Sequence, residues 1–408
     1  MSRSIRTGLV LLLVCSASAL FAATAAGTAP SAKSRSPWQL FGGAKLDIGR
    51  PLLAFDWAAN RVWVATATND VPIMWSARAS GGRLRGFVQT RIPADAGRLF
   101  PIVAGELLLP KLDSTTGRQV TTTLLDTGRL GPEKTVAEDV AAGVKQVRPE
   151  LPGAGILGGV RLGGRVVWLV ESNRSQKNYY LACCGESGAA SDLSRFFDPQ
   201  AFMLFVHLGV DSRGRLWVAW LDTKGYGAVR GRPRILELDP STLAPRSSAA
   251  AIPGLIADRV ELACGTSCRL VAQSAAGDIV SWAPGERSTT HILNHVSHGK
   301  FGGDSAFLLA ATYRGGGLAV AYDANAVRTG VPRYEFRVSR GDARGANAQV
   351  IGAIPRAETW PPQNVTARIN TPNNVSAAFA PAGLVTVETF LDAGGSSPVV
   401  AAIVPLGR

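Results

Sequence analysis

The sequence predicts an all-β fold made of repeated four-stranded antiparallel sheets. Three observations predict it. Strand-like stretches recur at a spacing near 50 residues, the segments between them are rich in Gly, Pro, Asp and Ser, and helical periodicity is scarce. The most helix-like stretch, KTVAEDVAAGVKQV at residues 134–147, we interpret as strand and loop. The spacing is the strongest of the three observations.

One pattern, a small turn followed by an apolar strand that often carries Trp, occurs seven times. The occurrences are NRVWVATATND from 60, GELLLPKLD from 105, GRVVWLVES from 164, GRLWVAWLD from 214, SCRLVAQS from 267, GLAVAYD from 317 and GLVTVETFLD from 383. They lie 45, 59, 50, 53, 50 and 66 residues apart. A period near 50 is typical of propellers with four-stranded blades. The sequence therefore predicts a seven-bladed β-propeller.

The repeat around residue 210 can be assigned strand by strand. Residues 202–211, FMLFVHLGVD, are expected as the inner strand, and SRG turns the chain into the second strand, RLWVAWLD. A longer loop, TKGYGAVRGRP, leads to the third strand, RILELD, and PSTLAP turns toward the fourth. Turn residues and β-branched or aromatic strand residues thus alternate as four antiparallel strands require.

The last repeat lacks a fourth strand of its own. The chain ends in SSPVVAAIVPLGR, which supplies a third strand, while SPWQLFGGAKL at residues 36–46 belongs to no repeat. Open sheet edges favour unwanted pairing. We therefore expect the N-terminal segment to pair with Val399–Val404 and close the propeller.

The N-terminus has the features of a secretory signal peptide. It combines Arg3 and Arg6 with an apolar run over 9–23 and a small-residue cleavage site at 23–25. We expect a signal peptide at 1–25, a disordered leader at 26–35 and a single propeller domain at 36–408. No later stretch is apolar for long enough to span a membrane. The sequence predicts a monomer that is secreted or held at the cell envelope, with no stable membrane span after cleavage.

The charge balance favours an anionic partner. The chain has 43 Lys and Arg against 30 Asp and Glu, a formal net charge of +13. An exported basic protein can bind acidic polysaccharides or other anionic polymers. The alternative is a coding bias toward Arg, because the arginines are scattered and form no block. No nucleic-acid-binding motif is present, so we expect no nucleic-acid partner.

The repeats resemble those of exported bacterial β-propellers, including sialidase-like and quinoprotein-like proteins. DSRGRLWVAW at residues 211–220 is similar to the Asp-box turn of sialidase-like blades, S-x-D-x-G-x-x-W, with Asp and Ser in the opposite order. The arginine triad and the Tyr/Glu pair of a sialidase are not found at assignable positions. The resemblance implies a propeller and leaves the activity open.

Four cysteines follow the predicted cleavage site, an even number for an oxidising compartment. Cys264 and Cys268 flank a three-residue turn, which brings them close enough for a disulfide. Cys183 and Cys184 are then left to each other, and this pair resembles the vicinal disulfide of some quinoprotein alcohol dehydrogenase propellers. We favour a structural disulfide; free or intermolecular thiols and a ligand platform are the alternatives. A four-cysteine zinc site is disfavoured.

An acid ends the second strand in six repeats: Asp70, Asp113, Glu171, Asp222, Asp323 and Asp392. In a propeller these strand ends gather on one face around the channel. Carboxylates there could bind cations or act as the acid and base of a glycan hydrolase, with Asp222 and Asp323 as catalytic candidates. The alternative is a turn role, because Asp side chains bond to their own backbone.

Two loops run from Asp through Arg to Pro-Arg. Their candidate ligand-binding residues are Lys224, Tyr226, Arg230 and Arg232 in LDTKGYGAVRGRPR, and Arg328 and Arg333 in YDANAVRTGVPR. Arginine forks bind carboxylates and sulfates, and tyrosine offers a stacking face for a sugar. Ordinary solvated hairpins are the alternative.

The histidines do not indicate a metal site. HILNHVSHGK carries His291, His295 and His298, without the glutamate of a zinc helix and in a strand-like context. His207 we interpret as a core or channel-lining residue. We expect no metal and no cofactor.

The leading interpretation is an exported binding or scaffolding module that recognises anionic glycans or an envelope protein. The alternative is a glycan-active hydrolase or lyase with carboxylates at the channel mouth. A quinone-dependent dehydrogenase would depend on the cysteine pair alone.

Overall fold

The protein is described by a computed structural model, in which Pro37–Arg408 forms one compact unit. The structure describes residues 37–40, 54–58, 61–68, 71–91, 102–103, 106–109, 120–125, 127–135, 155–174, 177–183, 189–197, 204–224, 230–294, 305–328, 331–341, 349–356, 375–389 and 399–407. The expected signal peptide at 1–25 and the leader at 26–35 lie outside these residues, and so does most of the segment 134–147.

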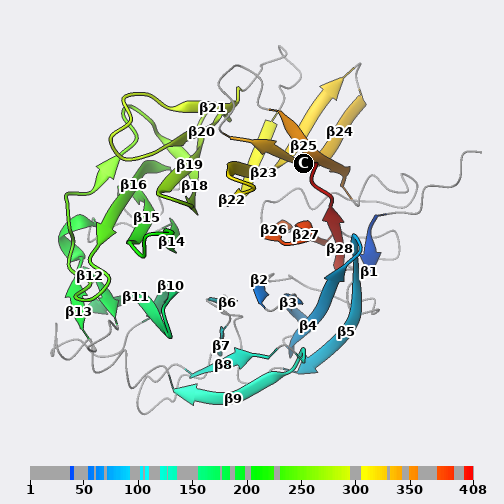
Figure 1. Cartoon of the computed structure of the whole chain (residues 1–408), viewed down its shortest axis with the longest axis horizontal. Helices are drawn as coiled ribbons and strands as arrows, with labels where there is room; N and C mark the ends of the chain where they lie inside the picture. The colour runs from blue at the N-terminus through cyan, green and yellow to red at the C-terminus, as the bar shows by residue number, and fades with distance from the viewer. Residues whose placement is uncertain are drawn as a thin grey trace, which may run out of the picture. The chain divides into compact units, whose positions relative to one another are not determined.

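The described part of the chain is almost entirely β-strand (Figure 1). The strands are β1 (Gln39–Leu40), β2 (Ala54–Ala58), β3 (Arg61–Thr68), β4 (Val71–Ser80), β5 (Arg83–Arg91), β6 (Ile102–Val103), β7 (Glu106–Leu109), β8 (Val120–Leu124), β9 (Leu130–Thr135), β10 (Gly155–Leu162), β11 (Arg165–Arg174), β12 (Lys177–Cys183), β13 (Ala190–Asp192), β14 (Leu204–Val210), β15 (Leu216–Thr223), β16 (Gly231–Leu238), β17 (Ala250–Ala251), β18 (Ala257–Cys264), β19 (Cys268–Ser274), β20 (Ile279–Trp282), β21 (Thr290–Leu293), β22 (Ser305–Arg314), β23 (Gly317–Arg328), β24 (Val331–Arg340), β25 (Val350–Pro355), β26 (Val375–Ala380), β27 (Gly383–Thr389) and β28 (Val399–Val404). A 3₁₀ turn, η2, covers Ser194–Phe196. No helix in these residues is long and apolar enough to cross a membrane.

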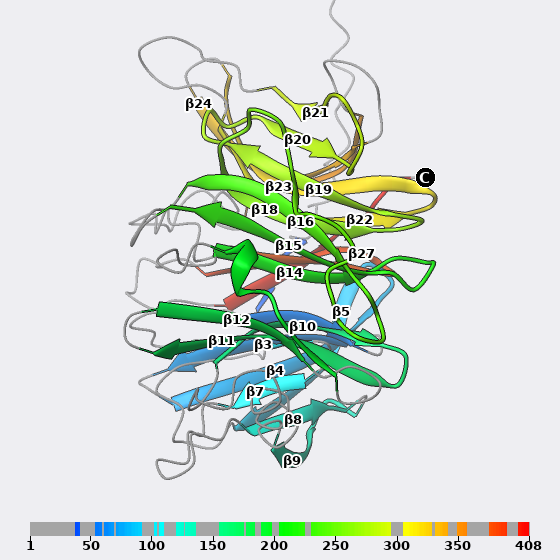
Figure 2. The same ribbon diagram turned by 90° about the vertical axis from the view of Figure 1, so that its left-hand side faces the viewer.

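Consecutive strands pair antiparallel in chain order. The sheets are β2–β5, β6–β9, β10–β13 and β22–β25, and β1 joins β26–β28 to complete another. The strands β14–β17 and β18–β21 form one larger sheet, because the single pair Gly231 and Ala257 joins β16 to β18. The side view shows β10–β12 and β14–β16 as separate layers (Figure 2).

The predicted repeat coincides with the pairing. Each of the seven quoted stretches forms the second strand of its group: β3, β7, β11, β15, β19, β23 and β27. The four strands expected around residue 210 are β14, β15, β16 and β17. Turn spacing and apolar runs therefore predicted the order of the strands.

The first strands of successive groups contact one another in series. β2 contacts β6, β6 contacts β10, and the contacts continue through β14, β18, β22 and β26, which in turn contacts β2. Antiparallel four-stranded meanders whose inner strands meet in this way are the construction of a β-propeller. The all-β, antiparallel part of the predicted fold is thus confirmed.

Apolar side chains fill the spaces between neighbouring sheets. Between β10–β13 and β14–β16, the ring of Phe197 contacts Tyr180 and Trp220 in tilted pairs, with centroid distances of 4.7 and 4.5 Å. Tyr180 and Trp220 are almost completely buried. A large buried side chain of this kind contributes about 1.5–3 kcal/mol, so these layers hold the sheets together.

The short strand β1 pairs antiparallel with β28, with Gln39 opposite Ala401 and Leu40 opposite Val400. The side chains of Trp38 and Gln39 contact two adjacent sheets. Trp38 Nε1 donates to the carbonyl of Pro355 at 2.9 Å. The side-chain amide of Gln39 accepts from Leu84 N at 2.7 Å and donates to Leu84 O at 3.2 Å. Residues 38–40 therefore connect β25, β28 and β5.

Candidate functional site

The β15–β16 hairpin brings three of the predicted ligand-binding residues together. Lys224 follows β15, Arg230 precedes β16, Arg232 lies on β16, and all three side chains are exposed. We call these three residues the basic rim. Tyr226 lies outside the described residues. In the described part of the chain, neither Lys224 nor Arg232 has an ion-pair partner, so both cations are available to an anionic ligand.

The backbone of this hairpin is tightly constrained. Thr223 is paired with Gly231 and Asp222 with Arg232. A Cβ atom at Gly231 would collide with the backbone carbonyl of Asp222. A glycine here therefore permits the close approach of strands that sets the position of Arg230 and Arg232.

The catalytic candidate Asp222 is ion-paired. Its Oδ2 accepts from Arg234 Nε at 2.5 Å, and both side chains are partly buried. Arg230 Nε donates to Asp258 Oδ1 at 2.8 Å, which connects the hairpin to the start of β18. The acid of the hairpin is thus neutralised within its own sheet, and the exposed charge at the rim is positive.

The second catalytic candidate, Asp323 on β23, is held by an arginine from another part of its sheet. Arg356, which follows β25, donates from Nη1 to Asp323 Oδ2 at 3.0 Å. The same guanidinium donates from Nε and Nη2 to Glu388 Oε1 at 2.9 and 2.6 Å. Glu388 is completely buried on β27. This network joins two sheets, which is a structural use of the Asp323 carboxylate.

Glu171, Asp222 and Asp323 occupy equivalent positions. Each lies six residues beyond the first paired residue of its second strand, which is Arg165, Leu216 or Gly317. The other three acids of the expected ring, Asp70, Asp113 and Asp392, lie outside the described residues. Burial raises the pKa of Glu171, and a hydrogen bond with Tyr180 partly opposes the rise.

The second predicted loop lies on another sheet. Arg328 ends β23 opposite Val331, and Arg333 on β24 is opposite Ala326. Their side chains lie outside the described part of the structure. The strand register thus places them on one hairpin, separate from the hairpin of the basic rim.

The inner strands β14 and β18 carry a polar cluster that sequence reasoning did not assemble. His207 Nδ1 on β14 lies 3.8 Å from Glu261 Oε2 on β18, and both side chains are partly exposed, by 28% and 21%. Burial raises the pKa of Glu261, while the charges of His207 and Arg259 oppose the rise. His207 was expected to be a core or channel-lining residue. Glu261 was missed because nothing in the local sequence indicates its partner.

Arg259, two residues before Glu261, is fixed by the next inner strand. Its guanidinium carbon lies 3.7 Å from the ring centroid of Phe307 on β22, and Nη1 donates to Leu308 O at 2.6 Å. Burial lowers the pKa of Arg259 to about 10, with the charge of Glu261 opposing the shift. The register shift between Ala257 and Arg259 breaks strand alternation, so the sequence could not give the face of this side chain.

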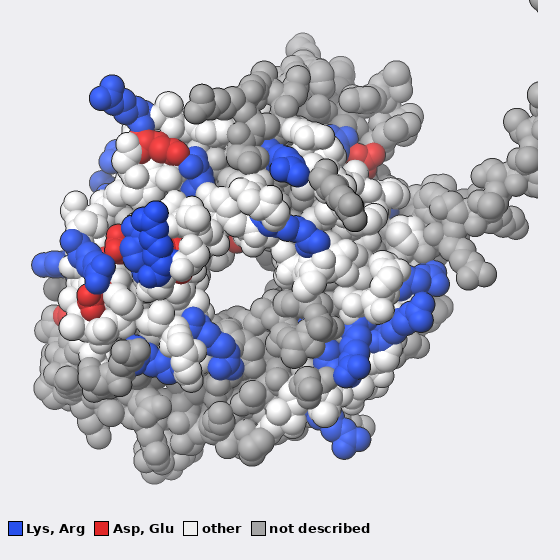
Figure 3. Space-filling model, viewed as in Figure 1, with Lys and Arg blue, Asp and Glu red and all other residues white. Residues whose placement is uncertain are grey.

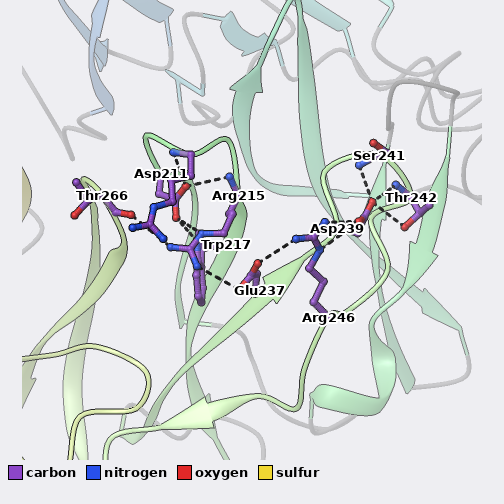
Figure 4. Close-up of polar contacts among 10 residues, drawn as sticks. Asp211, Arg215, Trp217, Glu237, Asp239, Ser241, Thr242, Arg246 and Thr266 are labelled. Atoms are coloured by element: carbon purple, nitrogen blue, oxygen red, sulfur yellow. Dashed lines mark hydrogen bonds and ion pairs between the residues drawn. The ribbon is translucent and has the colours of Figure 1, made fainter.

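The turn that resembles an Asp-box is organised by Asp211 (Figure 4). Its Oδ1 accepts from the backbone N–H groups of Arg213 and Arg215, both at 3.0 Å. Its Oδ2 accepts from Arg215 Nε at 2.7 Å and Trp217 Nε1 at 3.3 Å. Burial raises the pKa of Asp211, but these hydrogen bonds outweigh it and the net pKa is lowered. These four hydrogen bonds show that Asp211 stabilises the turn between β14 and β15.

A chain of alternating charges continues from this turn (Figure 4). Arg215 Nη1 lies 3.9 Å from Glu237, Glu237 lies 3.5 Å from Arg246, and Arg246 donates to Asp239 at 2.7 Å. Backbone N–H groups of Ser241 and Thr242 and the guanidinium of Arg246 hold the pKa of Asp239 well below its usual range. Asp211 and Asp239 thus cap turns through backbone N–H groups, whereas Glu237 links Arg215 to Arg246.

Of the predicted disulfides, Cys264–Cys268 is confirmed, and the two residues face each other across the β18–β19 turn. Cys183 is buried and disulfide-bonded. Cys184 lies outside the described residues, so the vicinal pairing stays a prediction. His291 is exposed on β21, and His295 and His298 lie outside the described residues. Where the structure describes side chains, it contains no group of three metal-ligating residues.

Comparison with known proteins gives similarity at the level of architecture. No family model matches the chain, and no match was found among curated proteins. Among solved structures, the chain is similar to the Dos1 propeller, at 7% identity over 84% of this chain and 75% of that one, with a TM-score of 0.41. It is similar to the NanB sialidase from Streptococcus pneumoniae, at 11% identity over 90% and 71%, with a TM-score of 0.40. It is also similar to TolB from Acinetobacter baumannii, at 11% identity over 87% and 80%, with a TM-score of 0.37.

Proposed function

We propose that this chain is an exported, monomeric β-propeller of seven blades that binds an anionic ligand, an acidic glycan or the acidic surface of an envelope protein. The closing element in this proposal is the β1–β28 pairing, supported by the contact between β26 and β2. The proposed signal peptide would place the protein outside the cytoplasm, where a cystine such as Cys264–Cys268 persists.

The observation that supports the binding function is that basic side chains of the β15–β16 hairpin are exposed, whereas its acidic side chain is ion-paired. Lys224 and Arg232 are exposed, whereas Asp222 is occupied by Arg234. Cations of this kind bind carboxylates and sulfates, and arginine does so through a bidentate fork. An exposed cationic surface attracts polyanions and loses affinity as salt screens its field.

The alternative is a glycan-active hydrolase or lyase that uses Asp222 and Asp323. A hydrolase needs one carboxyl as acid and a second at a defined separation as base or nucleophile. Each candidate here is bound by a guanidinium, from Arg234 or Arg356, and the two acids lie on different sheets. We therefore favour the binding function.

The test is an array of acidic and neutral glycans incubated with the purified protein and read for binding and, by mass spectrometry, for product. We expect salt-sensitive binding to acidic glycans and no product. The variant Lys224→Ser, Arg230→Ser, Arg232→Ser should bind at least tenfold more weakly. Product that disappears in an Asp222→Ala, Asp323→Ala variant would instead establish the enzyme. Neither binding nor product on any glycan would favour a protein partner.

A further inference from the structure

Three arginines lie in an exposed group on the β4–β5 hairpin. Arg78 on β4 is directly opposite Arg85 on β5, and Ser80 is opposite Arg83. Directly opposed residues share a face of the sheet, as do residues two apart on one strand. Arg78, Arg83 and Arg85 therefore project from the same face, and all three are exposed. We call them the arginine strip.

The strip has no acidic neighbours along its own strands. No Asp or Glu occurs between residues 71 and 94. Arg61 on β3 is opposite Arg78, but it is buried and donates to Ser76 Oγ at 3.2 Å, so it is not part of the exposed strip. Basic side chains gather over the part of the surface where β5 is drawn, with no acidic side chain drawn among them (Figure 3). Arg78 and Arg85 are directly opposite and both exposed; like charges opposite one another destabilise a sheet, and an anionic ligand would reduce that repulsion.

The opposite face of the hairpin is occupied. Leu84 and Ala79 pack into a core with Val385 and Ile403 of the last sheet. The arginine strip thus stands on a hairpin held rigid from behind. The backbone that carries the three arginines therefore needs little ordering when a ligand binds.

The outer edge of β5 is blocked to an added peptide strand near its first residues. Both backbone groups of Leu84 are bonded to the side-chain amide of Gln39. A partner peptide that added a strand here would need those groups. At this position, beside Arg83 and Arg85, a ligand would therefore be recognised by side chains. Among the described side chains of β4 and β5, Phe87 is the only exposed ring, at 37%, whereas single-stranded nucleic acid favours several stacking rings.

We propose that the arginine strip is a docking site for a linear polysaccharide that carries carboxylate or sulfate groups, with Arg78, Arg83 and Arg85 binding successive anionic groups and Phe87 contacting a sugar face. The proposal rests on the proposed function for the class of ligand, and it adds a second set of contacts on β4–β5, apart from the basic rim. A row of forks fits a polymer better than a single acidic sugar, because one sugar can engage only one or two of them.

The test uses the full chain in biolayer interferometry against immobilised alginate, dextran sulfate, neutral dextran and single-stranded DNA. The strip variant is Arg78→Thr, Arg83→Thr, Arg85→Thr. The matched control is Arg195→Thr, Arg213→Thr, Arg287→Thr, which removes three exposed arginines from other sheets and turns. Thermal melting of each variant checks that it is folded.

We expect the strip variant to bind alginate and dextran sulfate at least tenfold more weakly than the parent, with a smaller dependence on salt, while the control changes by less than threefold. Equal losses in both variants would overturn the strip as a site. Loss in the Lys224→Ser, Arg230→Ser, Arg232→Ser variant alone would overturn the strip and keep the proposed function. No binding to any acidic polymer would overturn both, and preference for DNA would replace the polysaccharide.

Discussion

At the residue scale, arginine partners decide which acids of this protein remain available. Asp222, Asp323 and Glu388 each accept from a guanidinium, and Asp211 accepts from Arg215 and from backbone N–H groups. Acids that are already bound in this way hold strands and turns in place. Replacing one of these acids should therefore lower the stability of the protein.

The Arg356→Met variant should lower the free energy of unfolding by about 3–5 kcal/mol, because it leaves the buried carboxylate of Glu388 without its main partner. The double variant Arg356→Met, Glu388→Met should recover most of this loss, since two apolar side chains can replace a buried ion pair. Urea unfolding monitored by tryptophan fluorescence measures both. A single variant as stable as the parent would show that the network is dispensable.

The Asp211→Asn variant should lose stability in a pH-dependent way. The pKa of Asp211 is lowered in the folded state, so its contribution is present above the pKa of the unfolded chain and is lost as pH falls through the folded pKa. The difference between variant and parent should thus be largest near neutral pH and should narrow below about pH 4. Melting temperatures from pH 7 to pH 3 test this. An equal difference at every pH would assign the effect to shape and not to charge.

At the scale of the elements, hairpin geometry explains how the basic rim forms. Arg230 and Arg232 are placed by the pairing of Thr223 with Gly231, and Asp222 reaches diagonally to Arg234. The position of the rim therefore depends on a backbone contact that only glycine permits at residue 231.

The Gly231→Ala variant should destabilise the protein by about 1–3 kcal/mol, because its Cβ would meet the Asp222 carbonyl. Gly164→Ala is the matched control. Residue 164 lies in the β10–β11 turn with nothing within 4 Å of an added Cβ, and its change should stay within about 0.5 kcal/mol. Chemical unfolding compares the two. If both variants behaved alike, the close approach at Gly231 would carry no strain.

The strands could be predicted from the sequence because turns, apolar runs and spacing are local properties. The contacts of the candidate sites are not local. Arg356 bonds Glu388 from another sheet, and His207 meets Glu261 from the neighbouring inner strand. The face of the sheet on which the Arg259 side chain lies depends on a register shift, and a single sequence does not reveal that shift. The basic rim was predictable because both of its strands belong to one hairpin.

At the scale of the whole chain, residues 38–40 connect three sheets that are far apart in sequence. Trp38 bonds Pro355 and packs on Phe336 with a centroid distance of 5.7 Å. Gln39 bonds both backbone groups of Leu84. No other strand covers the edge of β28 in the described part of the chain.

The Trp38→Ala, Gln39→Ala variant should therefore loosen three places together. Hydrogen–deuterium exchange should accelerate at β5, β25 and β28 and remain unchanged in β14–β16, which residues 38–40 do not contact. Uniformly faster exchange would indicate a global loss of stability. Exchange identical to that of the parent would show that these residues do not hold the sheets.

The pairing of β1 with β28 also has a consequence for the order of folding. Of the described strands, β1 is synthesised first and β28 last, so this pairing has the largest sequence separation among them. Non-local pairings of this kind form slowly, and an unpaired edge is open to wrong partners while it waits. β1 can pair with β28 only after the ribosome has synthesised residues 399–404. A chain cut short before residue 399 would therefore leave β1 without its partner strand.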